Sequence, residues 1–381
     1  MSQPALRIAL VAGETSGDLL GGLLLDGLKA RWPHAQFVGI GGAQMIKRGM
    51  QAWWPSEKLA VRGYLEVLRH YREIVGIRDQ LKSRLLQDKP DIFIGIDAPD
   101  FNLDLERDLK NAGIKTAHFV SPSIWAWRPE RIQKIVQSVD QMLCIFPFEK
   151  KLYDEAGLPA TYVGHPLAGV IPMQPDRAAA RSLLGLSETD TVVALLPGSR
   201  RDEVKYLISR LFEALAGIES ARSATKFIVP CIPNLQAMIE QAARQASVAG
   251  KVQLVQAQSH TVLAACNVAI VASGTATLEA ALFKRPMVIA YNMNWISWQI
   301  MRRKKLQPWV GLPNILCGEF VVPELLQGDC TPEALARETL AWLQSPEKIS
   351  ALEQRFAALH TELQRNTPEL AAHAIEEVLS R

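Results

Sequence analysis

The sequence contains little cysteine, and its cysteines follow no pairing or metal-binding pattern. The five form an odd set without CxxC spacing, namely Cys144, Cys231, Cys266, Cys317 and Cys330. We therefore expect neither a disulfide framework nor a cysteine-based zinc site. A reducing compartment, the cytoplasm, fits this pattern best.

Long hydrophobic runs and a strong net charge are also missing. No apolar stretch reaches about 18 residues, so no membrane-spanning helix is expected. The N-terminus up to Leu6 has no basic region, long apolar region or cleavage site, so we expect no signal peptide. The net charge of +3 is too small to predict binding to nucleic acid.

Two common nucleotide-binding motifs are absent. No G-x-G-x-x-G follows the first predicted strand, and no G-x-x-x-x-G-K-[ST] occurs. These absences disfavour a dinucleotide dehydrogenase and a P-loop NTPase. His118, His165 and His260 are scattered along the chain. We therefore expect no metal site, no divalent metal in the chemistry and no cofactor.

What the sequence does contain is an alternation of short apolar runs with longer helical stretches. Runs of this kind indicate parallel strands buried on both faces, so the fold class is α/β with two doubly wound, Rossmann-like domains. Prolines near residues 166–175 mark the boundary. We predict domains at 1–165 and 166–345 and a helical tail at 346–381. The predicted strands are Ile8–Val11, Gln36–Ile40, Ile92–Ile96, Thr116–Val120, Met142–Ile145, Val192–Leu196, Lys226–Val229, Val252–Val255, Val268–Val271 and Met287–Ala290.

The segment from Ala272 to Glu279 follows a predicted strand and opens a helix. Its small residues, Ser273, Gly274 and Thr275, allow backbone N–H groups to approach a phosphate, whose charge the helix dipole favours. Glu279, one turn into the helix, can accept hydrogen bonds from ribose hydroxyls. An ordinary capped helix explains the same pattern equally well.

A second glycine-containing turn, from Leu196 to Glu203, carries Arg200 and Arg201. Arginine binds a diphosphate through two parallel hydrogen bonds, which lysine cannot do. The alternative is a surface turn whose arginines pair with Asp202 and Glu203.

The N-terminal half has two further candidate sites. Asp97 ends a buried strand, where open α/β sheets bind ligands and a shielded carboxylate can act as a general base. A helix cap or a structural aspartate is the alternative. The loop from Gly13 to Asp18, which contains Glu14 and Ser16, can hold a phosphate-bearing acceptor, or Ser16 or Asp18 can simply cap the helix.

Aromatic and basic residues are interleaved at 295–309. Trp295 and Trp298 precede Arg302 and Arg303, a composition typical of segments at a membrane surface. The alternative, a helix with one face in the core, leaves exposed tryptophans unexplained. The stretch 59–86 is a second candidate, although for most of 72–86 a core-facing helix is the better interpretation.

With these motifs in place, nearly the whole chain resembles the lipid-A-disaccharide synthase family. The resemblance rests on GETSGD at 13–18, GIDAPDFN at 95–102, SPSIWAWRPERI at 121–132, PFE at 147–149, GHP at 164–166, LLPGSR at 195–200, ASGTATLE at 272–279 and LPN at 312–314.

The resemblance implies a GT-B glycosyltransferase, with two Rossmann-like domains facing a cleft and a tail that crosses back to the first domain. It implies transfer of 2,3-diacylglucosamine from UDP to 2,3-diacylglucosamine 1-phosphate, which yields the lipid A disaccharide 1-phosphate and UDP. The implied UDP-sugar site includes Arg200, Ser273, Gly274, Thr275, Glu279 and Asn314. The implied acceptor site includes Glu14, Ser16 and Asp18.

The anomeric centre would invert, with Asp97 as the base. The acylated substrates imply a peripheral enzyme on the cytoplasmic face of the inner membrane, in contact with anionic lipid through Trp295, Trp298, Arg302 and Arg303. No nucleic-acid partner is expected, and a homodimer is left open. The competing interpretations are a UDP-N-acetylglucosamine 2-epimerase, another UDP-sugar transferase, or a two-lobed binding protein without catalysis.

Overall fold

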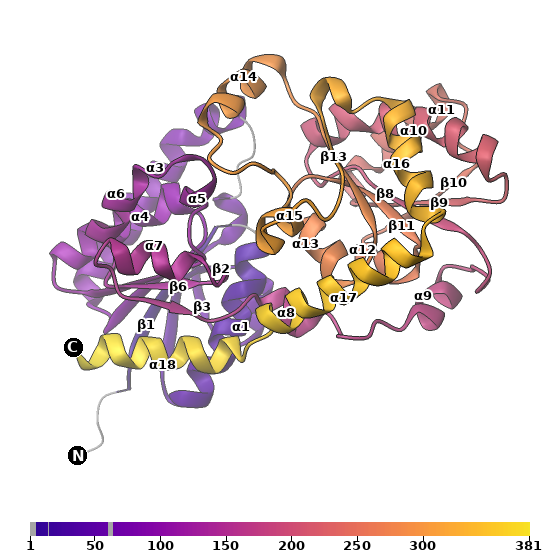
Figure 1. Cartoon of the computed structure of the whole chain (residues 1–381). Coiled ribbons are helices and arrows are strands. Elements are labelled where there is room, and N and C mark those ends of the chain that lie inside the picture. Colours follow the sequence, from indigo (N-terminus) through magenta and orange to yellow (C-terminus); the bar gives the residue numbers. More distant parts are fainter. Residues whose placement is uncertain (1–4, 14, 60–63) are drawn as a thin grey trace. The chain divides into compact units, whose positions relative to one another are not determined.

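The computed structural model describes residues 5–13, 15–59 and 64–381 (Figure 1). It divides into two compact units. The first comprises the described residues up to Gly169 together with Leu363–Arg381, and the second is Val170–Glu362. The sequence places these divisions after residues 165 and 345. The second division lies later in the structure because Leu352, Phe356 and Leu359 are buried in the second unit.

The first unit contains a parallel sheet in the order β3-β2-β1-β4-β5-β6-β7. Its strands are β1 Arg7–Ala12, β2 Gln36–Gly41, β3 Gln51–Pro55, β4 Ile92–Ile96, β5 Lys115–Phe119, β6 Gln141–Cys144 and β7 Ala160–Tyr162. Its helices are α1 Thr15–Arg31, α2 Ala43–Lys47, η1 Ser56–Lys58, α3 Tyr64–Asp88, α4 Pro99–Asn111, α5 Ile124–Trp127, α6 Arg131–Ser138, α7 Glu149–Glu155, α8 Pro166–Val170 and α18 Thr367–Ser380.

The second unit repeats this design with the strand order β10-β9-β8-β11-β12-β13, again parallel. Its strands are β8 Val192–Leu196, β9 Lys226–Cys231, β10 Val252–Gln256, β11 Val268–Ala272, β12 Met287–Tyr291 and β13 Glu324–Leu326. Its helices are α9 Arg177–Leu183, α10 Arg201–Ala221, η2 Pro233–Leu235, α11 Gln236–Gln245, α12 Ser259–Ala265, α13 Thr275–Leu282, α14 Trp295–Lys304, α15 Leu312–Cys317, η3 Gln327–Asp329, α16 Pro332–Leu343 and α17 Pro346–Leu363.

All ten predicted strands are present, with ends that shift by one or two residues at most. Three strands were missed, and all three lie at sheet edges: β3, β7 and β13. An edge strand is covered on fewer sides, so it does not need the continuous apolar run that marks a central strand.

In each sheet the strand order reverses at one point, called the switch point. In the first unit it lies between β1 and β4, and in the second between β8 and β11. Ligands of open α/β sheets bind beyond the carboxyl ends of the strands at such a point. The fold therefore singles out the loop after β1, the Asp97 turn, and the loops after β8 and β11.

The C-terminal helix α18 packs against α1 within the first unit (Figure 1). The approach is closest at Gly27, where an added Cβ would lie 2.0 Å from the Pro368 carbonyl oxygen. Because that atom belongs to the backbone, it cannot move aside easily. Gly27 thus allows the end of the chain to dock.

We expect Gly27→Ala to destabilise the first unit by about 1–3 kcal/mol, the usual cost of overpacking a buried contact. Gly76→Ala, on α3, is the matched control, because nothing lies within 4 Å of its added Cβ. The control should stabilise the helix by about 0.5–1 kcal/mol. Denaturant unfolding curves measure both changes. Equal midpoints for Gly27→Ala and the wild type would contradict this account of the contact.

Candidate functional site

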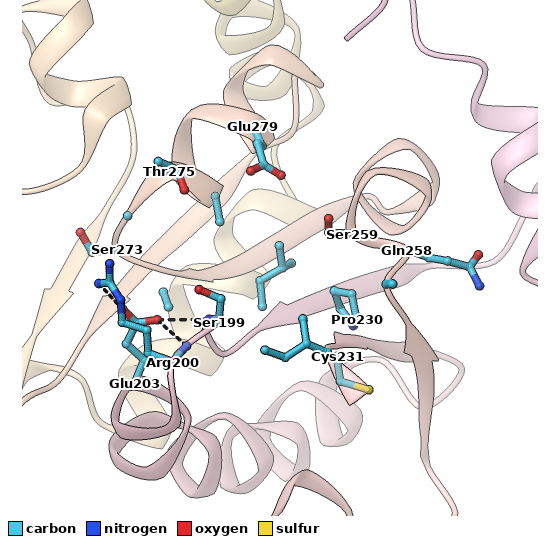
Figure 2. A pocket seen from close by; sticks show the side chains of 17 residues that line it. Ser199, Arg200, Glu203, Pro230, Cys231, Gln258, Ser259, Ser273, Thr275 and Glu279 are labelled. Atoms are coloured by element: carbon cyan, nitrogen blue, oxygen red, sulfur yellow. Dashed lines mark hydrogen bonds and ion pairs between the residues drawn. The ribbon is translucent and has the colours of Figure 1, made fainter. Parts of the chain in front are cut away.

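The second unit contains a cavity of about 440 Å³ at its switch point (Figure 2). Its walls come from the carboxyl ends of β8, β9 and β11, from the Gln258–Ser259 loop and from the start of α13. The size is that of a small-molecule site. Five of the six predicted nucleotide-sugar residues line it, namely Arg200, Ser273, Gly274, Thr275 and Glu279.

The start of α13 is shaped for a close ligand. Gly274 precedes the helix with φ of +151°, a conformation that favours glycine, and an added Cβ would meet nothing within 4 Å. Thr277 donates through Oγ1 to the Gly274 carbonyl oxygen over 2.7 Å, so this hydroxyl stabilises the turn. The first N–H groups of any helix lack an intrahelical acceptor and attract an anion. Thr275, at this end, lines the cavity.

On the opposite side of the cavity in Figure 2, Glu203 organises the turn after β8. Its Oε2 accepts from the backbone N–H groups of Ser199 and Arg200 over 3.1 and 3.2 Å. Its Oε1 lies 3.1 Å from Nη1 of Arg200. Arg200 therefore pairs with Glu203, as the alternative of a surface turn predicts. The Arg200 side chain is nevertheless 63% exposed, and an exposed ion pair contributes only about 0–1 kcal/mol, so it does not restrain the guanidinium strongly.

Glu279 points into the cavity from α13 and has a partner that the sequence did not reveal. His260 Nε2, from α12, lies 3.2 Å from Glu279 Oε2. The His260 ring also packs against Phe283, with ring centroids 5.3 Å apart. In the sequence, His260 looks like an isolated histidine. The cavity is also lined by Cys231, Gln258 and Ser259. No motif in the sequence indicated these three as binding residues.

Asn314, the sixth predicted nucleotide-sugar residue, lies outside the cavity. Its side chain is fully buried, and it does not line the cavity. Nδ2 donates to the Val322 carbonyl and to Glu324 Oε1, and Oδ1 accepts from the backbone of Val321 and Val322. An amide has two donors and two acceptor positions, and all four are used. Asn314 therefore fixes the connection from α15 to β13.

In the first unit, Asp97 lies at the carboxyl end of β4, as the sequence predicts. Its backbone has φ of +52°, and the next residue, Ala98, has φ of +43°. Val120, directly after the neighbouring strand β5, has φ of +78°, which is strained for a β-branched residue. The Asp97 N–H donates to the Phe119 carbonyl oxygen over 2.9 Å. Such strain is typical of functional sites, and the Asp97 side chain is only half-buried.

The loop after β1 reaches the same place. A Cβ on Gly13 would lie 3.0 Å from the Cβ of Ala98, so this glycine allows the loop to approach the Asp97 turn. Ser16, near the start of α1, is exposed. Glu14, the third predicted acceptor residue with Ser16 and Asp18, lies outside the described residues.

Asp18 has a structural role, although it does not cap the helix of its own loop, as the alternative expects. It is 5% exposed, and its carboxylate accepts backbone hydrogen bonds from Gly42, Gln44 and Met45 over 2.8, 2.9 and 3.1 Å. These are the unpaired donors at the start of α2. Asp18 therefore caps a neighbouring helix and leaves little capacity for an acceptor.

The α14 segment exposes large apolar side chains beside basic ones. Trp295 is 70% exposed and Ile300 54%, whereas Trp298 is half-buried. Arg302 and Arg303 are exposed. The exposed Trp295 is the feature that a helix with one face in the core leaves unexplained. In 72–86, for which a core-facing helix is the better interpretation of the sequence, Ile77, Leu81 and Leu85 are buried.

The described residues contain neither a cluster of metal ligands nor a helix suited to crossing a membrane. Within 5–13, 15–59 and 64–381, no three histidine, cysteine, aspartate or glutamate side chains gather as metal ligands would. In the same ranges, no helix combines the length and apolar character needed to cross a bilayer.

Comparison with known proteins identifies the family. Residues 8–375 match the family model described as lipid-A-disaccharide synthetase. The lipid-A-disaccharide synthase of Albidiferax ferrireducens is 66% identical over 379 residues, covering 98% of this chain and 97% of that protein. The enzyme of the same name from Verminephrobacter eiseniae is 58% identical over 383 residues, covering 99% and 98%.

Solved structures confirm the predicted GT-B fold class. A putative UDP-N-acetylglucosamine 2-epimerase from Listeria monocytogenes has a TM-score of 0.66 at 13% identity, covering 98% of this chain and 95% of that one. The glycotransferase of kitacinnamycin has a TM-score of 0.65 at 16% identity, covering 99% and 100%. Similarity at this level shows the fold alone. The family match over residues 8–375 and the relatives at 66% and 58% identity establish that this chain belongs to the lipid-A-disaccharide synthase family.

Proposed function

We propose that this chain transfers 2,3-diacylglucosamine from UDP to 2,3-diacylglucosamine 1-phosphate in lipid A biosynthesis, releasing UDP. Family membership over nearly the whole chain is the observation that carries the proposal. The cavity at the second switch point supports a nucleotide-sugar donor, because it combines a helix start, an exposed arginine and a carboxylate.

The proposed chemistry is a single in-line displacement that inverts the donor carbon. Asp97 takes the proton of the acceptor 6-hydroxyl as that oxygen bonds to C1 of the donor sugar. The C1–oxygen bond to UDP breaks, and the leaving diphosphate keeps the electron pair. Arg200 and the N-terminus of α13 stabilise its negative charge, and Glu279 binds the ribose. The acceptor binds at the Asp97 turn and the loop after β1.

A UDP-N-acetylglucosamine 2-epimerase is the second candidate, because such an enzyme shares the fold. An assay of UDP release separates the two. A transferase releases UDP in proportion to product only when the diacylated acceptor is present. Release without acceptor indicates a hydrolase, and conversion of the donor to an isomeric UDP-sugar without release of UDP indicates an epimerase. A binding protein releases none.

The acylated substrates motivate a second proposal, peripheral attachment to the cytoplasmic face of the inner membrane through α14. Arg302 and Arg303 provide attraction to anionic lipid, which falls off within a Debye length. Trp295 and Ile300 provide exposed apolar area for the headgroup region.

Charge reversal at Arg302 and Arg303 to glutamate should weaken binding to anionic vesicles by at least about 2 kcal/mol, or roughly 30-fold. Lys150→Glu with Lys151→Glu, on α7, is the matched control with the same change in net charge. Vesicle sedimentation at low and high salt measures the effect, and salt should mimic the α14 variant. If neither salt nor the α14 substitutions change sedimentation, α14 is not the anchor.

A further inference from the structure

A buried polar cluster packs against the turn that carries Asp97. Its members are Asn102 and Glu106 on α4 and His118 on β5, and all three side chains are fully buried. Glu106 Oε1 lies 2.7 Å from His118 Nδ1. Asn102 donates through Nδ2 to the Asp97 carbonyl oxygen over 2.9 Å. The cluster thus reaches the backbone of the proposed catalytic residue directly.

Strand β4 is adapted to the Glu106 carboxyl group. Gly95 of β4, which pairs with His118 of β5, lies directly against the Glu106 carboxyl group. A Cβ on Gly95 would lie 2.1 Å from Glu106 Oε1. Any other residue at position 95 would therefore push the carboxyl away from the strand. Glu106 therefore requires a glycine at position 95, two residues before Asp97.

The cluster also ties together the two strands that hold the Asp97 peptide. His118 directly precedes Phe119, whose carbonyl oxygen accepts from the Asp97 N–H. The Glu106–His118 contact therefore links α4, β4 and β5 at the point where Asp97 leaves the sheet. A shift of His118 would move the neighbouring Phe119 carbonyl, which accepts from the Asp97 N–H. A shift of α4 would move Asn102, which donates to the Asp97 carbonyl.

Charge couples the same groups. Burial raises the pKa of the Glu106 carboxyl, although His118 opposes the shift. Burial by itself lowers the pKa of His118, but the charge and hydrogen bond of Glu106, together with the charge of Asp97, raise it overall. The imidazole is therefore close enough to respond to the Asp97 carboxylate.

The arrangement is costly for stability. Glu106 Oε2, His118 Nε2 and Asn102 Oδ1 are buried without a hydrogen-bond partner among the described residues. Unpartnered buried polar atoms cost free energy, and apolar side chains of similar size are often at least as stable. A costly cluster beside a strained turn is typical of a functional site.

We propose that Glu106 and His118 are positioning residues for Asp97, which hold the turn after β4 so that its carboxylate meets the acceptor hydroxyl. The inference rests on the proposed role of Asp97 as general base.

Glu106→Leu and His118→Leu should each lower kcat about 10–100-fold, the usual loss when a reacting group is misplaced. The KM of the UDP-sugar and the affinity for UDP should not change, because the cavity belongs to the second unit. Glu106→Gln keeps the shape and an acceptor oxygen, and His118→Asn keeps a donor near Nδ1. Both should recover most of the lost kcat. The two leucine variants are independent, so one remains informative if the other does not fold.

Leu109→Ala, in the buried apolar face of α4, is the control for a purely structural effect. It should lower the thermal midpoint but leave kcat per folded molecule unchanged. If the leucine variants lose activity only in proportion to their folded fraction, or if the conservative variants lose as much as the leucine variants, the inference is overturned.

Asp97→Asn, assayed in parallel, separates this inference from the proposed function. Full activity of Asp97→Asn means that the general-base proposal itself fails. An inactive Asp97→Asn alongside leucine variants with normal kcat contradicts only the positioning role.

Discussion

Asp97→Asn is expected to lower kcat by about 10²–10⁴-fold, because the amide keeps the shape of the side chain but cannot take a proton. The turn itself should survive, since the Asp97 backbone makes the hydrogen bonds to Phe119 and Asn102. Donor KM and UDP affinity should therefore stay near the wild-type values. Steady-state kinetics with both substrates and UDP calorimetry measure the two effects.

Asp100→Asn is the matched control for this substitution. Asp100 lies three residues further along, in the first turn of α4, and its side chain is 81% exposed in an ion pair with Arg131. Loss of an exposed pair should leave turnover unchanged. Near-normal kcat in Asp97→Asn, or an equal loss in both variants, would remove Asp97 from the role of base.

Arg200→Ala is expected to weaken UDP binding by about 1.5–3 kcal/mol, or roughly 10–150-fold, because the diphosphate loses charge-assisted hydrogen bonds. The wild-type Arg200 must first leave Glu203, which costs little for so exposed a pair. Arg201→Ala is the control, since the adjacent Arg201 is exposed and does not line the cavity. Calorimetry that gives both variants the same UDP affinity would contradict the assignment.

Glu279→Ala tests the other end of the same ligand. Its carboxylate lines the cavity from α13, one turn beyond the residues assigned to the phosphates. The substitution should weaken UDP more than it weakens pyrophosphate, which has no ribose. Equal losses for the two ligands would exclude a ribose contact and indicate an effect on the cavity as a whole, for example through His260.

The sequence predicted those parts of the fold that depend on local pattern. Central strands such as β1 and β11 are buried on both faces, so each forms an uninterrupted apolar run. Asp97 was found for the same reason, because it ends such a run. The edge strands β3, β7 and β13 were not predicted, because a partly exposed strand does not need a continuous apolar run.

Some candidate residues have contacts outside their own motifs, and the sequence did not reveal these contacts. Asp18 binds the start of α2, 24 to 27 residues away, and no motif announces that contact. Asn314 is held by Val321, Val322 and Glu324, beyond the short LPN motif. His118 looked isolated until the fold placed it against Glu106. Tertiary contacts of this kind leave no periodic trace in the sequence.

The central claim is an inverting transfer from a UDP-linked donor, and the anomeric configuration of the product tests it most directly. The purified chain would be incubated with α-linked UDP-2,3-diacylglucosamine and 2,3-diacylglucosamine 1-phosphate, and the new linkage examined by proton NMR. A single displacement with Asp97 as base predicts a β-1,6-linked disaccharide 1-phosphate with the large coupling constant of a trans-diaxial anomeric proton. An α linkage, or a monosaccharide epimer without any disaccharide, would contradict the account.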